Sequence, residues 1–164
     1  MLKTLLLILF LFITSCSGSL TRIPASEKII HVTNEVQGRT QQQLLDMTRF
    51  WMEKYFTVHA EPVVLEDRQE GIITGIGHID YPCSWVECVT KGDLQVSFTM
   101  RVDVQGEVIN TTFLNVEIFT PSSGLDPVYQ GGMNAQVWSK RDMDAIRPEL
   151  LELNRALVDF LLDK

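Results

Sequence analysis

Two of the three cysteines in the sequence, Cys83 and Cys88, have a spacing that allows several kinds of thiol chemistry. A catalytic redox pair normally has two residues between its cysteines and lies at the start of a helix. This pair instead has four intervening residues, follows Pro82, and lies between two apolar segments. A structural disulfide is therefore the favoured interpretation, and a redox pair, a metal site or two free thiols are the alternatives.

The third cysteine, Cys16, lies at the end of an N-terminal export signal. Lys3 precedes an apolar stretch over residues 5–13, and Thr14 and Ser15 come directly before Cys16. A positive start, a short apolar core and small residues before the cut are the three parts of a secretory signal. The apolar stretch is about half of the ~20 residues that a membrane-spanning helix needs. Residues 13–16 resemble the bacterial lipobox, whose cysteine receives a diacylglycerol and becomes the first residue after cleavage.

This resemblance predicts an organisation in three parts. Residues 1–15 form a lipoprotein signal peptide, residues 16–26 are the lipidated cysteine and a polar tether, and residues 27–164 are one folded domain. Lipid on Cys16 would hold the chain on a membrane, because two or more acyl chains give stable attachment. Ser17 after the cysteine implies the outer membrane, facing the periplasm. An ordinary signal peptide with a chance cysteine is the alternative. Export also favours a Cys83–Cys88 disulfide, because exported thiol pairs are usually oxidised.

The charge balance of the chain limits its partners. It has 14 basic and 21 acidic residues, and loss of Lys3 with the signal peptide makes the balance 13 − 21 = −8. An acidic surface disfavours nucleic acid and anionic lipid headgroups. We therefore expect no nucleic-acid partner. The expected contacts are the membrane, through the lipid on Cys16, and an envelope protein or a second copy of the chain.

The residue types of common enzyme and metal sites do not form a recognisable constellation. His31, His59 and His78 have no further ligand at metal-binding spacing, and His31 and His78 fall in predicted strands. The chain has no nucleophile elbow, zinc-protease helix motif or phosphate loop. The sequence therefore predicts no catalytic residue, no metal and no cofactor.

Five aromatic residues are candidates for a binding surface. Trp85, Tyr129 and Trp138 fall in predicted loops, where large aromatic side chains can mark contact sites. Phe113 and Phe119 fall on the polar face of a predicted strand, and an uncovered sheet face with aromatic groups can bind a partner or a second copy. The alternative is simple packing, with the segment from Tyr129 to Trp138 folding back across that face.

Hydrophobic periodicity predicts the elements that position these residues. Thr40 and Gln43 have the form of a capping box before a helix over 41–56. A last helix begins near Ser139, with Pro148 in its first turn or at a kink. The predicted strands cover 28–36, 63–65, 72–79, 94–104 and 107–119, and a long linker covers 120–138.

The strands indicate a sheet with one buried face. Residues 94–104 alternate strictly between apolar and polar, as in a strand with one wet face. In the next strand, the same alternation puts Leu114, Val116 and Ile118 opposite Phe113 and Phe119. In strand 72–79, two glycines at 75 and 77 share one face, which permits a bulge or the close approach of another element. The order β-α-β-β-β-β-α predicts a two-layer α+β domain, an antiparallel sheet with helices packed on one face.

From Lys28 to Phe119 the chain resembles a bacterial domain of unknown function that has a TATA-box-binding-protein-like (TBP-like) fold and is common in envelope lipoproteins. The resemblance rests on three features in order: the helix with Thr40-x-x-x-Leu44, Trp51 and Phe56, the motif Asp67-x-x-x-Gly71-x-Ile73-x-Gly75-x-Gly77, and the hairpin around Gln105-Gly106. It implies a TBP-like fold and an envelope setting, and it brings no catalytic residues.

Two hypotheses of function follow. The leading one is a non-enzymatic binding or assembly module, tethered at the envelope, that uses the open sheet face and the segment 120–138. The alternative is a periplasmic, hydrolase-like enzyme whose site is assembled from residues distant in sequence, such as His78 or Asp103.

Overall fold

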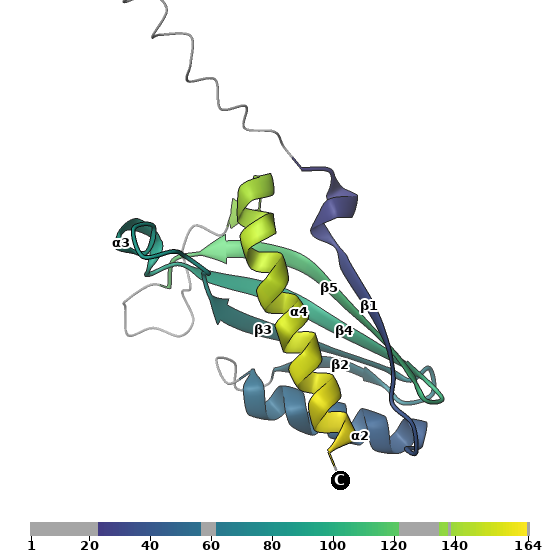
Figure 1. The fold of residues 1–164 in the computed structure, drawn as a ribbon. Helices are drawn as coiled ribbons and strands as arrows, with labels where there is room; N and C mark the ends of the chain where they lie inside the picture. The colour runs from purple at the N-terminus through teal and green to yellow at the C-terminus, as the bar shows by residue number, and fades with distance from the viewer. Residues whose placement is uncertain (1–22, 57–61, 122–134, 138, 164) are drawn as a thin grey trace, which may run out of the picture.

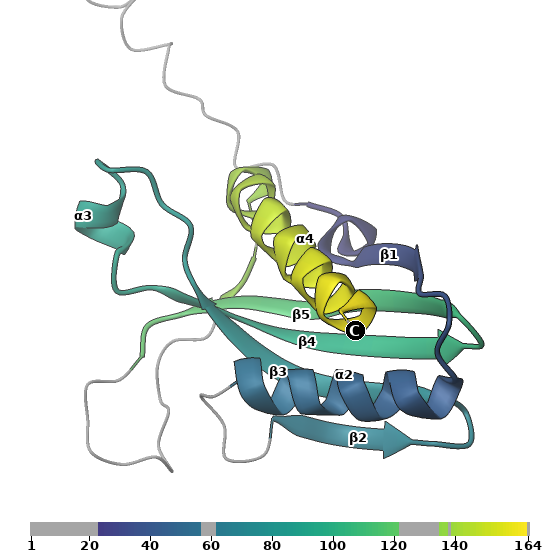
Figure 2. The same cartoon turned by 60° about the horizontal axis from the view of Figure 1, so that its bottom comes forward.

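The fold has two layers, a six-stranded antiparallel sheet and two long helices on one of its faces (Figures 1 and 2). The computed structural model describes residues 23–56, 62–121, 135–137 and 139–163. The strand order is β1-β5-β4-β3-β2, and β6 pairs with β5. The elements are η1 (Ala25–Lys28, a 3-10 helix), β1 (Ile30–Glu35), α2 (Gln41–Tyr55), β2 (Val63–Asp67), β3 (Ile72–Asp80), α3 (Cys88–Lys91), β4 (Gln95–Gln105), β5 (Val108–Phe119), β6 (Ala135–Gln136) and α4 (Lys140–Leu162). The predicted α+β architecture is confirmed.

Helix α2 begins at the predicted capping box. The Thr40 hydroxyl accepts a hydrogen bond from the Gln43 amide at 3.3 Å, and the Gln43 side chain accepts one from the Thr40 amide at 2.9 Å. These two bonds satisfy amides that have no partner inside the helix. The buried face of the helix carries Leu44, Leu45, Thr48, Trp51 and Met52.

Helix α4 begins where the sequence predicts, at Ser139, whose hydroxyl accepts from the Asp142 amide at 3.0 Å. Pro148 lies about two turns inside the helix, so its predicted place in the first turn is wrong. The far end of α4 is held by Arg39, which donates to the carbonyl of Leu161 at 3.0 Å and to that of Asp163 at 2.6 Å. The loop after β1 therefore fixes the C-terminal end of α4.

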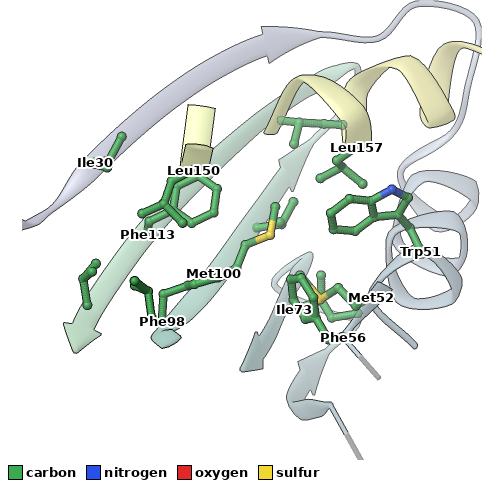
Figure 3. Close-up of a cluster of buried hydrophobic side chains, with 14 of the residues drawn as sticks. Ile30, Trp51, Met52, Phe56, Ile73, Phe98, Met100, Phe113, Leu150 and Leu157 are labelled. Atoms are coloured by element: carbon green, nitrogen blue, oxygen red, sulfur yellow. The ribbon is translucent and has the colours of Figure 1, made fainter. Parts of the chain in front are cut away.

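The core lies between the sheet and the two helices. Figure 3 shows Phe98, Met100 and Phe113 from the sheet meeting Trp51 from α2 and Leu157 from α4. Aromatic edge-to-face contacts run through this layer, because the ring centroids of Phe56 and Phe98, and those of Phe98 and Phe113, lie 5.7 Å apart.

The two glycines of β3 let α2 approach the sheet closely, as predicted. A Cβ atom at Gly75 would lie 2.9 Å from the Met52 sulfur. A Cβ atom at Gly77 would lie 2.5 Å from Phe98 and 2.9 Å from Phe56. Any side chain at these positions would force the aromatic groups of the core apart.

A β-bulge in β5 makes the predicted location of Phe113 wrong. The register runs from Thr99 opposite Leu114 to Ser97 opposite Glu117, so β5 has one residue more than β4 over this stretch. Asn115 lies in the bulge with φ of 53°. The extra residue reverses the alternation. Phe113 therefore points into the core, as does Val116 beyond the bulge, while Phe119 points to the opposite face.

Three short elements were not predicted: η1, α3 and β6. Ile23 is already buried, and η1 begins at Ala25, so the packed body begins before Ser26, where the sequence places the end of the tether. The pairing of β6 with β5 lies inside the segment predicted as a linker.

Candidate functional site

The sheet face that points away from α2 and α4, called the open face here, carries a small apolar centre. Ile76 of β3, Thr99 of β4 and Leu114 of β5 are aligned in one row across the three strands. Leu65 of β2 lies beside this row, opposite Thr74, and its side chain is 52% exposed. The centre of the open face is therefore partly accessible apolar surface.

Polar side chains on the β1 side of the open face bond mainly to one another. The His31 ring nitrogen Nδ1 lies 3.0 Å from the Thr112 hydroxyl, and the Thr33 hydroxyl donates to the Asn110 side-chain oxygen at 2.8 Å. These cross-strand pairs satisfy each other and stiffen the sheet. On this side of the open face the polar side chains are therefore satisfied within the sheet, and His31 makes a structural contact.

Carboxylates outnumber cations on the open face. The register places one arginine there, Arg101, whose guanidinium holds the Asp103 carboxylate at 2.6 and 2.9 Å. The hydrogen bond to Asp103 raises the pKa of Arg101, so the guanidinium stays charged. The acidic residues of the described open face are Glu35, Asp67, Asp80, Asp103 and Glu117. The face as a whole is therefore acidic.

The residues of the enzyme hypothesis, His78 and Asp103, lie far apart on this face. His78 is paired with Ser97, six residues along β4 from Asp103, which corresponds to about 20 Å. The His78 ring packs against the edge of Phe119 across β4, with centroids 5.1 Å apart. Phe119 is only 9% exposed in this contact. The fold therefore does not bring His78 and Asp103 into one site.

The most exposed apolar group of the described chain is on a segment that projects from the end of the sheet between β3 and β4, as Figure 2 shows at α3. We call residues 81–94 the clipped loop. The predicted disulfide between Cys83 and Cys88 is confirmed, with Cα atoms 5.2 Å apart. Trp85 is 94% exposed, Val86 78% and Val89 86%. The disulfide thus holds an apolar tip out in solvent.

The base of the clipped loop is fixed to the first turn of α4. The Tyr81 hydroxyl donates to the Asp142 carboxylate at 2.5 Å, and the Lys91 ammonium lies 3.0 Å from that hydroxyl and 3.1 Å from the carboxylate. Ser139 donates to the other carboxylate oxygen at 2.5 Å. We call Tyr81, Lys91, Ser139 and Asp142 the base cluster. The base cluster ties both ends of the clipped loop to the N-terminal turn of α4.

The protonation preferences of the base cluster are those of a structural network. Burial and the bond to Asp142 raise the pKa of Tyr81, and the bond to Tyr81 raises that of Lys91. Burial acts to raise the pKa of Asp142, but bonds from Ser139, Tyr81 and Lys91 outweigh it and lower that pKa. A tyrosine or lysine acting as a base at neutral pH needs a lowered pKa. The shifts therefore favour the neutral Tyr81 phenol, the Lys91 ammonium and the Asp142 carboxylate, and they do not prepare a catalytic base.

The remaining predicted site residues fall outside the described chain: Cys16, Tyr129 and Trp138. Within the described ranges, no group of three His, Cys, Asp or Glu side chains could hold a metal ion. None of the described helices is long and apolar enough to cross a membrane.

Comparison with known proteins identifies the family. The family model described as "Domain of unknown function (DUF4468) with TBP-like fold" matches residues 31–119, more than half of the chain. The chain belongs to this family. The match covers β1 to β5 and thus includes the open face and the clipped loop, whereas α4 lies beyond it.

One solved structure agrees with this fold. A TBP-like protein from Parabacteroides distasonis superimposes with a TM-score of 0.60 at 8% identity, over 88% of this chain and 99% of that one. A DUF4468 family protein from Bacteroides ovatus has 17% identity and a TM-score of 0.49, over 86% of this chain and 84% of that one. No curated protein matches this DUF4468 chain.

Sequence reasoning found Trp85 but missed its surroundings. Val86 and Val89 follow Trp85 closely, and their proximity to an exposed aromatic was the available signal. The base cluster left no such signal, because Tyr81 and Asp142 are 61 residues apart in the chain.

Proposed function

We propose that this DUF4468 chain is an envelope lipoprotein, anchored through Cys16 to the outer membrane on its periplasmic side, whose domain is a non-enzymatic binding or assembly module. The observation that carries the binding role is the open face, an acidic surface with an apolar centre around Leu65, Ile76 and Leu114. The partner that fits it is an envelope protein with basic side chains around an apolar patch. The acidic charge also supports a partner other than nucleic acid.

The distribution of polar groups supports binding over catalysis. His31 is engaged by Thr112, Asp103 by Arg101, and His78 packs on Phe119. A general acid or base needs a free position beside its substrate, and each of these side chains makes a structural contact with a neighbour on the sheet.

Photocrosslinking from the open face tests the proposed partner. Benzoylphenylalanine replaces Leu65 on the open face in one variant and Leu151 on the outer side of α4 in the control variant, where the native side chain is 39% exposed. In intact cells we expect a discrete adduct from position 65 that position 151 does not give. An adduct of twice the mass of the chain would identify the partner as a second copy. Equal labelling from both positions, or none from position 65, contradicts the proposal.

Charge reversal tests the chemistry of the partner. Glu117→Lys on the open face should reduce the yield of the Leu65 adduct, because it replaces an attraction by a repulsion. Glu149→Lys, an exposed position on α4, makes the same charge change away from this face and should leave the yield unchanged. Equal reductions of the adduct yield by both substitutions would show that binding depends on the net charge of the chain and not on the charge of the open face.

The anchor is tested separately by detergent partition. The native chain should enter the detergent phase of Triton X-114, and Cys16→Ser should remain in the aqueous phase. Identical partition of the two chains contradicts the lipid anchor. It does not affect the crosslinking test of the open face.

A further inference from the structure

The apolar tip of the clipped loop is formed by Trp85, Val86 and Val89, and these side chains lie almost wholly in solvent. The disulfide at its neck and the base cluster at its root hold the tip in one position. Keeping such side chains in water is unfavourable, and a rigid exposed tryptophan is typical of a contact site.

Two of the three charged groups of the clipped loop are drawn away from this tip, because Glu87 is paired with Arg141 and Lys91 with Asp142. The third, Asp93, is exposed and lies at the β4 end of the loop, four residues beyond Val89. The tip itself, with the most exposed large side chains of the loop, is apolar and uncharged. Its contact surface is suited to an apolar medium and not to a charged partner.

The start of the described chain lies at the same end of the molecule. Arg147 of α4 donates to the Glu27 carbonyl of η1 at 2.9 Å, and Arg141 pairs with Glu87 of the loop. These two arginines are six residues apart, about 9 Å along α4. Figures 1 and 2 show η1 and α3 on either side of the N-terminal half of α4, away from the β4–β5 turn.

The reach of the predicted anchor places this end beside the membrane. Ile23 is buried in the body, and only seven residue steps join it to Cys16. Seven fully extended residues span at most about 25 Å. A lipid on Cys16 therefore keeps the end of the body that carries η1 and the clipped loop close to the bilayer surface.

We propose that the clipped loop is a membrane-contact site, whose Trp85, Val86 and Val89 enter the interfacial layer of the bilayer that holds the lipid anchor. The inference rests on the proposed anchoring at Cys16 and adds to it a fixed orientation. Tryptophan prefers the interface between lipid and water. Three apolar side chains are too few for a stable protein interface, which buries about 800 Å² per partner, but they suffice as a second membrane contact beside an acyl anchor.

This orientation has a consequence for the open face. Two membrane contacts, the apolar tip and the lipid anchor that leads into η1, restrict the rotation of the domain about axes parallel to the membrane. The sheet is then held with its β3–β4 end towards the lipid, and the acidic face is presented sideways to proteins in the same layer.

Depth-dependent fluorescence quenching tests the proposal. The native lipidated chain is reconstituted in vesicles of phosphatidylcholine and phosphatidylethanolamine that contain phosphatidylcholine brominated on its acyl chains. Trp51 lies in the core, so its emission should be insensitive to bromine. We expect a quenched component in the native chain that is lost in Trp85→Phe, and that persists at high salt because no charge carries the contact.

Matched variants separate the tip from general hydrophobicity. Val86→Ser together with Val89→Ser should reduce the quenching of Trp85, whereas Leu162→Ser, an exposed apolar position at the opposite end of α4, should not. Thermal unfolding of each variant verifies that the fold is intact. Equal quenching of the native chain and Trp85→Phe overturns the proposal.

The outcomes also separate this proposal from the anchor and from a protein partner. A native chain that enters the detergent phase but shows no Trp85 quenching retains the anchor and overturns the membrane contact. A protein partner would give a different pattern: Trp85 is shielded in native envelopes and position 86 gives a photocrosslinked protein adduct, but Trp85 is not quenched in pure lipid vesicles. In that case the tip of the clipped loop binds a protein, and the proposal is wrong.

Discussion

Replacement of Phe113 by alanine tests the most consequential feature of the fold, the bulge at Asn115. Phe113 is fully buried, and its ring lies 5.7 Å from that of Phe98. Truncation of a buried phenylalanine costs about 3–5 kcal/mol, because the transfer term and the cavity term add. In a domain of this size, 1 kcal/mol lowers the melting temperature by roughly 3–4 °C. We therefore expect Phe113→Ala to melt about 9–20 °C below the native protein.

Phe119 is the matched control, because the same residue type lies six positions along the same strand on the opposite face. Its aromatic contact is the His78 ring, and it keeps 9% exposure on the open face, outside the core between the sheet and the helices. We expect its loss to leave a hollow that opens to solvent and not an enclosed cavity. Phe119→Ala should therefore cost only the transfer term, about 1.5–3 kcal/mol.

Denaturant unfolding followed by circular dichroism measures both free energies. Substitution by glutamine should widen the difference, because its amide at position 113 would be buried without water, whereas position 119 keeps some exposure to solvent. Simple alternation along β5 predicts the same cost at both positions. Equal losses, or a larger loss for Phe119→Ala, would refute the bulge and the orientation of Phe113.

Three further predictions concern the close helix contact, the base cluster and the disulfide. Gly77→Ala should destabilise the fold by about 1–3 kcal/mol in denaturant unfolding, because its Cβ would lie 2.5 Å from Phe98. Asp142→Asn should lower the free energy of unfolding most near neutral pH. The pKa of Asp142 is lower in the folded protein than the unfolded value of about 3.9, so its carboxylate stabilises the fold above that pH. This stabilisation is lost as the pH falls through the folded pKa. The stability difference from the native protein should therefore shrink in titrations below about pH 4, and a constant difference would contradict this assignment. Replacing both Cys83 and Cys88 by serine should cost no more than about 2 kcal/mol, the closure entropy of so short a loop, with the sheet unchanged by circular dichroism. Global unfolding of that double variant would show that the loop supports the core.

Much of this fold was predictable because its signals are local. The capping box at Thr40 and the N-cap at Ser139 are made by residues three apart in the chain, and both were found at the predicted positions. The strict alternation in β4 predicted its buried face, since side chains alternate across a pleated strand. The spacing of Cys83 and Cys88 likewise predicted their bond.

The prediction for β5 failed because alternation carries no information about an inserted residue. Asn115 supplies the left-handed conformation found in this bulge, but asparagine is also an ordinary residue of turns. Only pairing with β4 shows that one extra residue is present and that Phe113 faces the core.

The candidate surfaces divide in the same way between sequence and tertiary structure. The sequence by itself predicted a lipid anchor at Cys16, favoured the disulfide and placed Trp85 in a loop, because each of these depends on residues close together in the chain. The tertiary structure decided that Tyr81, Lys91 and Asp142 meet at the root of the clipped loop, and that the loop shares one end of α4 with the start of the packed chain. It also decided that His78 and Asp103 are about 20 Å apart along the sheet. Such proximity depends on strand order and helix packing, and these arise from contacts between residues many positions apart, which no local pattern records.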